Sequence, residues 1–364
     1  MNAPAQKPIL VMAGGTGGHV FPALAVAECL RAQGEQIVWL GTRAGIEARV
    51  VPAANFAIEW LNVQGLRGKG AAALLMAPFR LMRACWQALG ILRRTRPKAV
   101  LGMGGFASGP GGLMAWLMDI PLFLHEQNSV VGLTNRILNR LASGVYVAFP
   151  QAQENMKDAE CIGNPVREGF KNLPQPATRL QARMNEPLHL LVIGGSLGAA
   201  ALNSMLPRAI ACLDNDQRPL VRHQCGEKHL ATCREHYADN GVEAEVVSFI
   251  DDMAAAYCWA DLVVCRAGAL TISELSAVGC ASLLVPFPYA VDNHQLHNAR
   301  YLEQLDAAQV LPESGLNAED LALKFKFFQQ NRARLVEMAV NARAGFKADA
   351  SERLAAGILA GARS

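Results

Sequence analysis

The stretch PILVMAGGTGGHVFPALA (residues 8–25) decides the fold class of this chain. Pro8 to Ala13 is a continuous apolar run, typical of a strand that is buried on both faces of a parallel sheet. The glycines after it predict a tight turn, and the segment from about Gly18 to Ala32 predicts a helix. A buried strand, a glycine loop and a helix in this order begin a βαβ unit.

The same order of features recurs in the second half, at LHLLVIGGSLGAA (residues 188–200). Apolar runs alternate with amphipathic segments in both halves, which predicts two α/β domains of the Rossmann type. Other predicted strands are Gln36–Leu40, Ala57–Asn62, Ala99–Met103, Pro121–Leu124, Gly144–Ala148, Pro219–Gln224, Ala244–Phe249, Leu262–Cys265 and Ser282–Val285. A length of 364 residues also exceeds what one hydrophobic core usually serves.

The boundary between the two domains is predicted in the polar, turn-rich stretch Gly163 to Arg167. We assign residues 1–165 to the N-terminal domain and residues 166–345 to the C-terminal domain. A last helical segment, at about residues 346–364, is expected to pack back on the N-terminal domain.

Composition excludes several classes of protein. Apolar residues make up 51% of the chain and charged residues 18%, which is not the composition of a disordered protein. The net charge of +3 is too small to predict nucleic-acid binding. Nine scattered cysteines without a CxxC pair predict thiols in a reducing cytosol. We find no signal-peptide pattern, and glycines interrupt the longest uncharged run, Ala99 to Met118, so we expect no membrane span.

Three glycine loops predict sites for phosphate groups. They are GGTGGH (14–19), GMGGF (102–106) and GGSLG (194–198), and each lies between a predicted strand and a helix. Glycine lets a ligand approach the backbone, and the free N–H groups of a helix N-terminus attract anions. The alternative interpretation is a plain turn. None of the loops has the P-loop pattern, and no acidic residue ends the second strand, so a dinucleotide site is disfavoured.

Several motifs, in order along nearly the whole chain, carry a resemblance to one family. They are GGTGGHVFPALA (14–25), GMGGFASGP (102–110), HEQNSVVGLTNR (125–136), GNPVR (163–167), GGSLGA (194–199), CRAGALTISEL (265–275) and VPFPYAVDNHQLHNA (285–299). With them the chain resembles the MurG family of bacterial peptidoglycan glycosyltransferases. The resemblance implies the GT-B fold, two Rossmann-like domains facing across a cleft. It also implies inverting transfer of N-acetylglucosamine from UDP-N-acetylglucosamine to the 4-hydroxyl of the N-acetylmuramyl pentapeptide of undecaprenyl-linked lipid I, which gives lipid II.

The resemblance places the donor site mainly in the second domain. The residues it implies are Ser196, Ile250, Ala269, Leu270, Thr271, Ile272, Ser273, Glu274 and Gln295, with Arg167 from the hinge and Thr16, Gly17, Gly18 and Asn128 from the first domain. Elementary chemistry agrees, because a helix that opens after Gly268 offers N–H groups to a phosphate and Glu274 can accept hydrogen bonds from ribose. The alternatives are a solvated carboxylate for Glu274 and a core side chain for Ile250.

Inversion requires a general base and stabilisation of the departing pyrophosphate. His19 is our preferred base, because an imidazole titrates near neutral pH and a helix N-terminus favours its neutral form. Glu126 is the rival base. The alternatives are a packing histidine and a carboxylate that orients a loop. Asp214-Asn215-Asp216 is interpreted as a polar turn, so we predict no metal site and no obligatory cofactor, while assistance by a divalent cation stays open.

Residues 61–100 contain eight Lys or Arg and no acidic residue. Pro78 is suited to the first turn of a helix, which places Phe79, Met82 and Trp86 on one face and Leu75 just outside it. With Arg80 and Arg83, this face predicts contact with an anionic membrane and the lipid-linked acceptor. The alternative is that the apolar stripe packs on the sheet.

The resemblance implies a peripheral protein on the cytoplasmic face of the bacterial inner membrane, with no nucleic-acid partner and with other cell-wall synthesis proteins as further partners. Three other functions stay open on the sequence: a UDP-N-acetylglucosamine 2-epimerase, an NAD(P) oxidoreductase and a non-catalytic scaffold.

Overall fold

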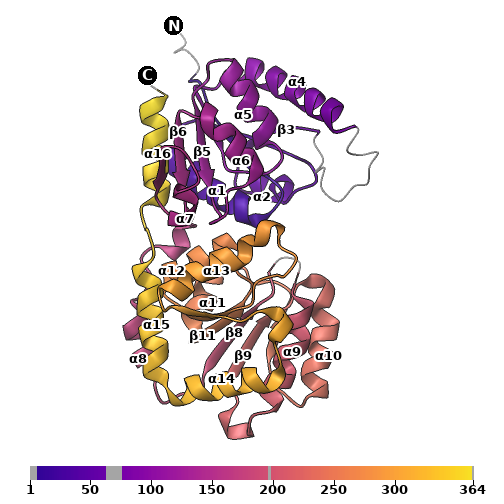
Figure 1. Cartoon of the computed structure of the whole chain (residues 1–364), viewed down its shortest axis with the longest axis vertical. Coiled ribbons are helices and arrows are strands. Elements are labelled where there is room, and N and C mark those ends of the chain that lie inside the picture. The colour runs from indigo at the N-terminus through magenta and orange to yellow at the C-terminus, as the bar shows by residue number, and fades with distance from the viewer. Residues whose placement is uncertain (1–5, 63–75, 196–197, 363–364) are drawn as a thin grey trace. The chain divides into compact units, whose positions relative to one another are not determined.

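The computed structural model describes residues 6–62, 76–195 and 198–362, and it divides the chain into two compact units. The first unit comprises Met1–Arg167 and Lys347–Ser364, and the second comprises Glu168–Phe346 (Figure 1). The observed boundary therefore lies two residues after the predicted one, which assigns Arg167 to the first unit.

The first unit is built on a parallel sheet of seven strands in the order β3-β2-β1-β4-β5-β6-β7. The strands are β1 (Ile9–Met12), β2 (Ile37–Gly41), β3 (Ala57–Trp60), β4 (Ala99–Gly102), β5 (Leu122–Glu126), β6 (Gly144–Val147) and β7 (Ala159–Cys161). All except β7 were predicted, with small shifts at their ends. The sequence analysis missed β7 because its three residues at a sheet edge, with Glu160 in the middle, form no continuous apolar run.

Helices cover both faces of this sheet (Figure 1). They are α1 (Gly17–Ala32), α2 (Glu47–Ala53), α4 (Ala77–Thr95), α5 (Ser108–Leu117), α6 (Leu133–Leu138), α7 (Pro150–Gln153) and α16 (Ala350–Gly361). The C-terminal helix α16 packs on α1 and β6 and contributes Leu354 and Ile358 to the core. Gly357 permits this contact, because a Cβ there would lie 1.8 Å from the hydroxyl of Tyr146.

The second unit has a parallel sheet of six strands in the order β10-β9-β8-β11-β12-β13. The strands are β8 (His189–Ile193), β9 (Leu220–Gln224), β10 (Glu245–Val247), β11 (Leu262–Cys265), β12 (Ala281–Leu284) and β13 (Ala308–Val310). The helices are α8 (Pro176–Gln181), α9 (Ala200–Ala211), α10 (Leu230–Asp239), α11 (Met253–Trp259), α12 (Ala269–Val278), α13 (His294–Gln304), α14 (Ala318–Gln330) and α15 (Arg332–Ala344). The short strand β13 was not predicted, and β10 ends two residues earlier than expected.

The strand order reverses at one point in each sheet, next to β1 in the first unit and next to β8 in the second. In open α/β sheets, ligands bind beyond the carboxyl ends of the strands at such a switch point. The glycine loops after β1, β4 and β8 are therefore at the two places where this fold binds ligands.

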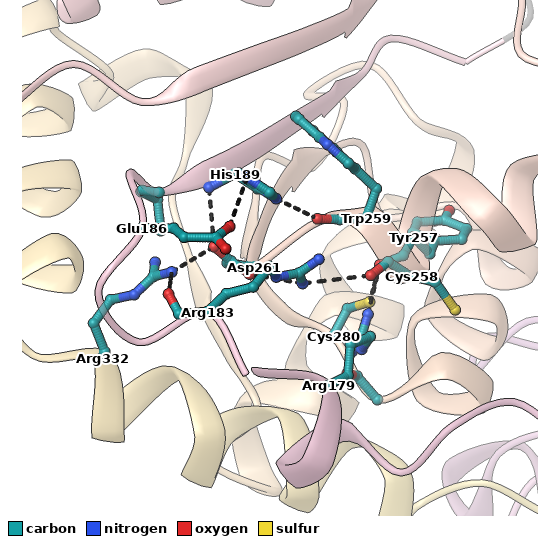
Figure 2. Close-up of polar contacts among 12 residues, drawn as sticks. Arg179, Arg183, Glu186, His189, Tyr257, Cys258, Trp259, Asp261, Cys280 and Arg332 are labelled. Atoms are coloured by element: carbon teal, nitrogen blue, oxygen red, sulfur yellow. Dashed lines mark hydrogen bonds and ion pairs between the residues drawn. The ribbon is translucent and has the colours of Figure 1, made fainter. Parts of the chain in front are cut away.

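The amino edge of the second sheet is closed by a buried cluster of charged side chains (Figure 2). Asp261 is 1% exposed, and its carboxylate lies 2.8 Å from Arg183 and 2.6 Å from Arg332. It also accepts a hydrogen bond of 3.0 Å from the backbone N–H of His189, whose ring stacks on Trp259. Arg183 follows α8 by two residues, Arg332 begins α15 and His189 begins β8, so the cluster connects two helices to the sheet and has a structural role.

Candidate functional site

The carboxylate of Glu47, on α2, forms a hydrogen bond with the backbone of the first glycine loop. The sequence analysis did not single out this residue. Glu47 is fully buried, and its carboxylate accepts hydrogen bonds from the backbone N–H of Gly15 (2.9 Å) and from the N–H and hydroxyl of Thr42 (2.9 and 2.7 Å). A carboxylate at this position already accepts a hydrogen bond from a loop N–H group, and its negative charge repels an anion. The geometry therefore disfavours the predicted phosphate site in this loop.

His19 lies in the first turn of α1, half-buried against the loop that follows β4. Its Nδ1 atom lies 2.8 Å from the Oε1 atom of Gln127, which comes from the end of β5. A Cβ at Gly104 would lie 2.8 Å from the same Nδ1, so the imidazole fits only beside glycine. Among the described residues, none forms a hydrogen bond with the other ring nitrogen of His19, Nε2. The base proposed from the sequence thus has one ring nitrogen fixed and one available.

The second glycine loop packs directly on the first. A Cβ at Gly105 would lie 2.5 Å from the carbonyl oxygen of Gly14, and Gly105 has a φ of +84°. Its glycines are therefore explained by close packing of two loops, which is the alternative interpretation that the sequence left open.

Glu126, the rival base, is 2% exposed and makes hydrogen bonds with both oxygens. One oxygen accepts from the N–H and side-chain amide of Asn128 (3.0 and 3.3 Å), and the other accepts from Gly132 N–H (3.0 Å) and Asn135 Nδ2 (2.9 Å). The carboxylate therefore holds the loop from Gln127 to Gly132, as the alternative interpretation expected. Its role as a base stays a prediction.

The third glycine loop rests on a neutral group. Gln224, at the end of β9, accepts a hydrogen bond from Gly195 N–H (3.1 Å) and donates to the carbonyl oxygens of Gly195 (3.1 Å) and Ser248 (2.9 Å). Gly195 has a φ of +81°, close to the +93° of Gly15 in the first loop. The predicted donor residue Ser196 lies outside the described residues. At Gly195 a positive φ like that of Gly15 is therefore combined with an uncharged amide as the partner of the backbone N–H.

The start of α12 supplies the strongest features for an anion in the second unit. The helix begins after Gly268, and its first intrahelical bond is donated by Ile272, so the N–H groups of Ala269, Leu270 and Thr271 precede the ladder. Ser273 and Glu274 follow, both buried. Glu274 is 6% exposed and accepts a hydrogen bond of 3.3 Å from Tyr257, so the alternative of a solvated carboxylate is wrong.

Two further predicted donor residues of this unit lie in loops at the same edge of its sheet. Ile250 follows β10 by three residues instead of ending it, and it is half-buried, so the core alternative is wrong. Gln295, in the first turn of α13, accepts a hydrogen bond of 2.9 Å from Phe287 N–H, which leaves its amide nitrogen to donate. For both residues, a role in binding the nucleotide-sugar stays a prediction.

Two arginines could support a departing diphosphate, and they differ in their surroundings: Arg266, three residues before α12, and Arg167, at the unit boundary. Arg266 forms an ion pair of 2.5 Å with Glu313 and donates to the carbonyl oxygen of Val285, so its charge is already compensated. Arg167 is half-buried in the first unit, with its guanidinium over the ring of Phe21 at 5.2 Å. Thr16, Gly17, Gly18 and Asn128 lie in that unit with His19.

The apolar stripe of α4 faces outward. Phe79 is 64% exposed, Met82 57% and Trp86 68%, and Arg80 and Arg83 are exposed beside them, while Ala84 and Ala88 face the core. The alternative that the stripe packs on the sheet is therefore wrong. Leu75 lies outside the described residues. In the described part of the chain, no helix combines the length and hydropathy that a membrane span requires.

Asp214, Asn215 and Asp216 form an exposed turn between α9 and β9, as predicted. The described ranges contain no group of three or more His, Cys, Asp or Glu side chains that could hold a metal ion. The groups at the carboxyl edges include backbone N–H groups, the amides of Gln127 and Gln224, and the imidazole of His19.

Comparison with known proteins identifies both units. Residues 9–147 match the glycosyltransferase family 28 N-terminal domain, and residues 189–354 match the family 28 C-terminal domain. Similar relatives occur in Alkalilimnicola ehrlichii (56% identity, 96% of this chain and 97% of the relative) and Chromohalobacter salexigens (53%, 96% and 96%). Both carry the name UDP-N-acetylglucosamine–N-acetylmuramyl-(pentapeptide) pyrophosphoryl-undecaprenol N-acetylglucosamine transferase.

Among solved structures, the crystal structure of MurG from Acinetobacter baumannii is similar, with a TM-score of 0.82 at 39% identity. It covers 97% of this chain, and this chain covers 99% of it. The expected GT-B arrangement of two Rossmann-like domains is thereby confirmed, and the transferase is favoured over the three other functions.

Proposed function

The chain belongs to glycosyltransferase family 28, and we propose that it transfers N-acetylglucosamine from UDP-N-acetylglucosamine to lipid I, giving lipid II. The observation that carries this proposal is the identity of 50% or more, over nearly the whole chain, with relatives that bear this transferase name. The acceptor atom is the 4-hydroxyl of the N-acetylmuramyl pentapeptide, and the reaction inverts the configuration of the anomeric carbon.

The donor binds to the second unit in this proposal. The N–H groups of Ala269 to Thr271 and the neutral loop over Gln224 receive the diphosphate, because neither brings a negative charge to it. Glu274 accepts hydrogen bonds from the ribose hydroxyls, Ile250 packs on the uracil, and Gln295 donates to the sugar. Leaving-group charge is stabilised by the helix N-terminus without a metal ion, so no cofactor is obligatory.

The acceptor binds to the first unit. His19 removes the proton of the attacking hydroxyl through Nε2. Thr16, Gly17, Gly18 and Asn128, whose predicted role is in binding the donor, lie in the same unit. The exposed face of α4, with Phe79, Met82, Trp86, Arg80 and Arg83, rests on anionic lipid of the cytoplasmic leaflet. A peripheral enzyme held in this way meets an acceptor whose lipid never leaves the bilayer.

The deciding experiment combines the protein, labelled UDP-N-acetylglucosamine and a lipid I analogue. We expect a disaccharide that forms only when the acceptor is present, and that still forms after divalent cations are chelated. Consumption of the donor without acceptor, by epimerisation or hydrolysis, would overturn the proposal. For the membrane face, Arg80→Glu with Arg83→Glu should weaken binding to anionic vesicles, whereas Arg208→Glu, on α9 of the second unit, should not.

A further inference from the structure

A chain of three hydrogen bonds runs through the first unit from Gly163 to His19. The Nε2 atom of His125 lies 2.9 Å from the carbonyl oxygen of Gly163. The Nδ1 atom of His125 lies 3.2 Å from the amide nitrogen of Gln127, and the amide oxygen of Gln127 lies 2.8 Å from Nδ1 of His19. His125 and Gln127 are both fully buried. These three hydrogen bonds connect the segment that precedes the unit boundary with the imidazole proposed as the general base.

The donor and acceptor of each hydrogen bond can be assigned, because backbone carbonyl oxygens in contact with His125 and Gln127 can only accept. The amide nitrogen of Gln127 lies 3.1 Å from the carbonyl oxygen of His125, which can only accept, so this side of the amide must be the NH₂ group. The atom that faces His19 is therefore the amide oxygen, which also can only accept. Hence Nδ1 of His19 carries a proton, and in the neutral imidazole the lone pair is on Nε2.

The hydrogen bond at Gly163, the other end of this series, is consistent with the same assignment of donors and acceptors. Nε2 of His125 faces the carbonyl oxygen of Gly163, so it must carry the proton and leave a lone pair on Nδ1 for the amide of Gln127. Burial lowers the pKa of His125 to about 4, so the ring is neutral at physiological pH. The two histidines therefore hold opposite tautomers, with Gln127 between them.

We propose that Gln127 and His125 are positioning residues that hold His19 as the Nδ1–H tautomer, with the lone pair of Nε2 facing the acceptor hydroxyl. This inference rests on the proposed function for the identity of the acceptor. In the transfer step, Nε2 takes the hydroxyl proton while the oxygen forms a bond to the anomeric carbon. The bond between that carbon and UDP breaks, its electron pair leaves with UDP, and the imidazolium later returns the proton to water.

An amide suits this position better than a carboxylate would. A carboxylate beside Nδ1–H favours the protonated imidazole, which cannot accept another proton. The adjoining elements carry two buried acidic side chains, Glu126 of β5 and Glu47 of α2, and both oxygens of each accept hydrogen bonds from loop donors. The neutral partner orients the ring without placing a negative charge beside Nδ1.

The first test needs no catalysis. In the full-length protein labelled with ¹⁵N-histidine, the signals of His19 and His125 are assigned from their loss in His19→Gln and His125→Gln. We expect a pyridine-like Nε2 and a protonated Nδ1 for His19, and the opposite pattern for His125. In Gln127→Leu, the tautomer preference of His19 should disappear. A protonated Nε2 on neutral His19 in the native protein would overturn the inference, even if transfer activity is intact.

The second test measures transfer by Gln127→Leu, with Gln153→Leu as a control because Gln153 lies on α7 and its side chain bonds to Ala159. We expect kcat to fall about 10- to 100-fold with the KM for the donor unchanged, and no further loss when the change is added to His19→Gln. Gln127→Glu should recover activity at higher pH, because a carboxylate favours the protonated ring. Additive losses, or a pH profile that does not move in Gln127→Glu, would contradict a role exerted through His19.

Discussion

The first glycine loops of the two units share one backbone feature and differ in the side chain that binds it. Gly15 and Gly195 both have positive φ, and the N–H group of each is held by a side chain from a neighbouring element. Under Gly15 that side chain is the carboxylate of Glu47, and under Gly195 it is the amide of Gln224. A negative charge disfavours phosphate at the first loop, and a neutral amide permits it at the third. The difference teaches that a glycine loop alone does not identify a phosphate site.

The two loops also differ in the residues that come after their glycines. The first continues into His19, whose ring is fixed by Gln127, whereas the third continues into the small residues Ala199 and Ala200. One loop therefore presents a side chain that can move a proton, and the other presents backbone. This division matches an enzyme in which one unit activates the acceptor and the other binds the nucleotide.

The largest expected effect comes from removing the side chain that makes the first loop reactive. His19→Gln should lower kcat by about 10²- to 10⁴-fold, the usual contribution of a general base. The dissociation constant of UDP-N-acetylglucosamine, measured by calorimetry, should stay within about threefold because the second unit is unchanged. A kcat near that of the native enzyme would remove His19 from the mechanism.

Placing a carboxylate beneath the third loop tests the comparison directly. Gln224→Glu should weaken UDP-N-acetylglucosamine binding by about 10- to 100-fold, because it brings like charge to the diphosphate and removes the amide donors. Uridine without phosphate serves as the control ligand and should lose much less affinity. Equal losses for both ligands would indicate a collapsed loop instead of electrostatic repulsion.

Each unit also has a buried neutral histidine close to its first loop, and this makes both units sensitive to acid. Burial lowers the pKa of His125 to about 4 and that of His223 to about 3, below the value of about 6.5 in the unfolded chain. The unfolded state therefore binds the proton first, and stability that is present above pH 6.5 is lost as the pH falls toward 4. When the pH is lowered from 7 to 5, the proton uptake linked to each of these two histidines should reduce the free energy of unfolding by about 2 kcal/mol.

Urea unfolding at the two pH values measures this loss. His223→Gln should reduce the loss for the second unit, whereas His229→Gln, in a short turn before α10, should leave it unchanged. Identical acid sensitivity in the native protein and in His223→Gln would contradict the assignment.

The smallest expected change in donor binding is that of Glu47→Gln. The donor affinity should stay within about threefold, since the groups proposed to receive the diphosphate lie in the second unit. Stability should nevertheless fall by about 1–3 kcal/mol, because an amide cannot accept all three hydrogen bonds of the carboxylate. A clear gain in affinity for UDP at this variant would show that the first loop can take phosphate once its carboxylate is removed.

Much of the fold could be predicted from the sequence because buried parallel strands are continuous apolar runs. Eleven of the strands were found in this way, and the short edge strands β7 and β13 were not, since three residues that are not all buried give no such signal. The exposed stripe of α4 was also predicted, from helical spacing and one-sided charge. The sequence could not distinguish Glu126 as a base from Glu126 as a loop anchor, because that depends on four donors brought to it by folding.

The sequence by itself determined the order of strands, loops and helices, the position of His19 after the first glycines, and the motifs that place the chain in its family. Only the tertiary structure decided what lies beneath each loop. Glu47 is 32 positions from Gly15, Gln127 is 108 positions from His19, and Gln224 is 29 positions from Gly195. Neighbouring parallel strands end at one edge and bring such distant residues within hydrogen-bonding reach, and local sequence patterns contain no record of those pairs.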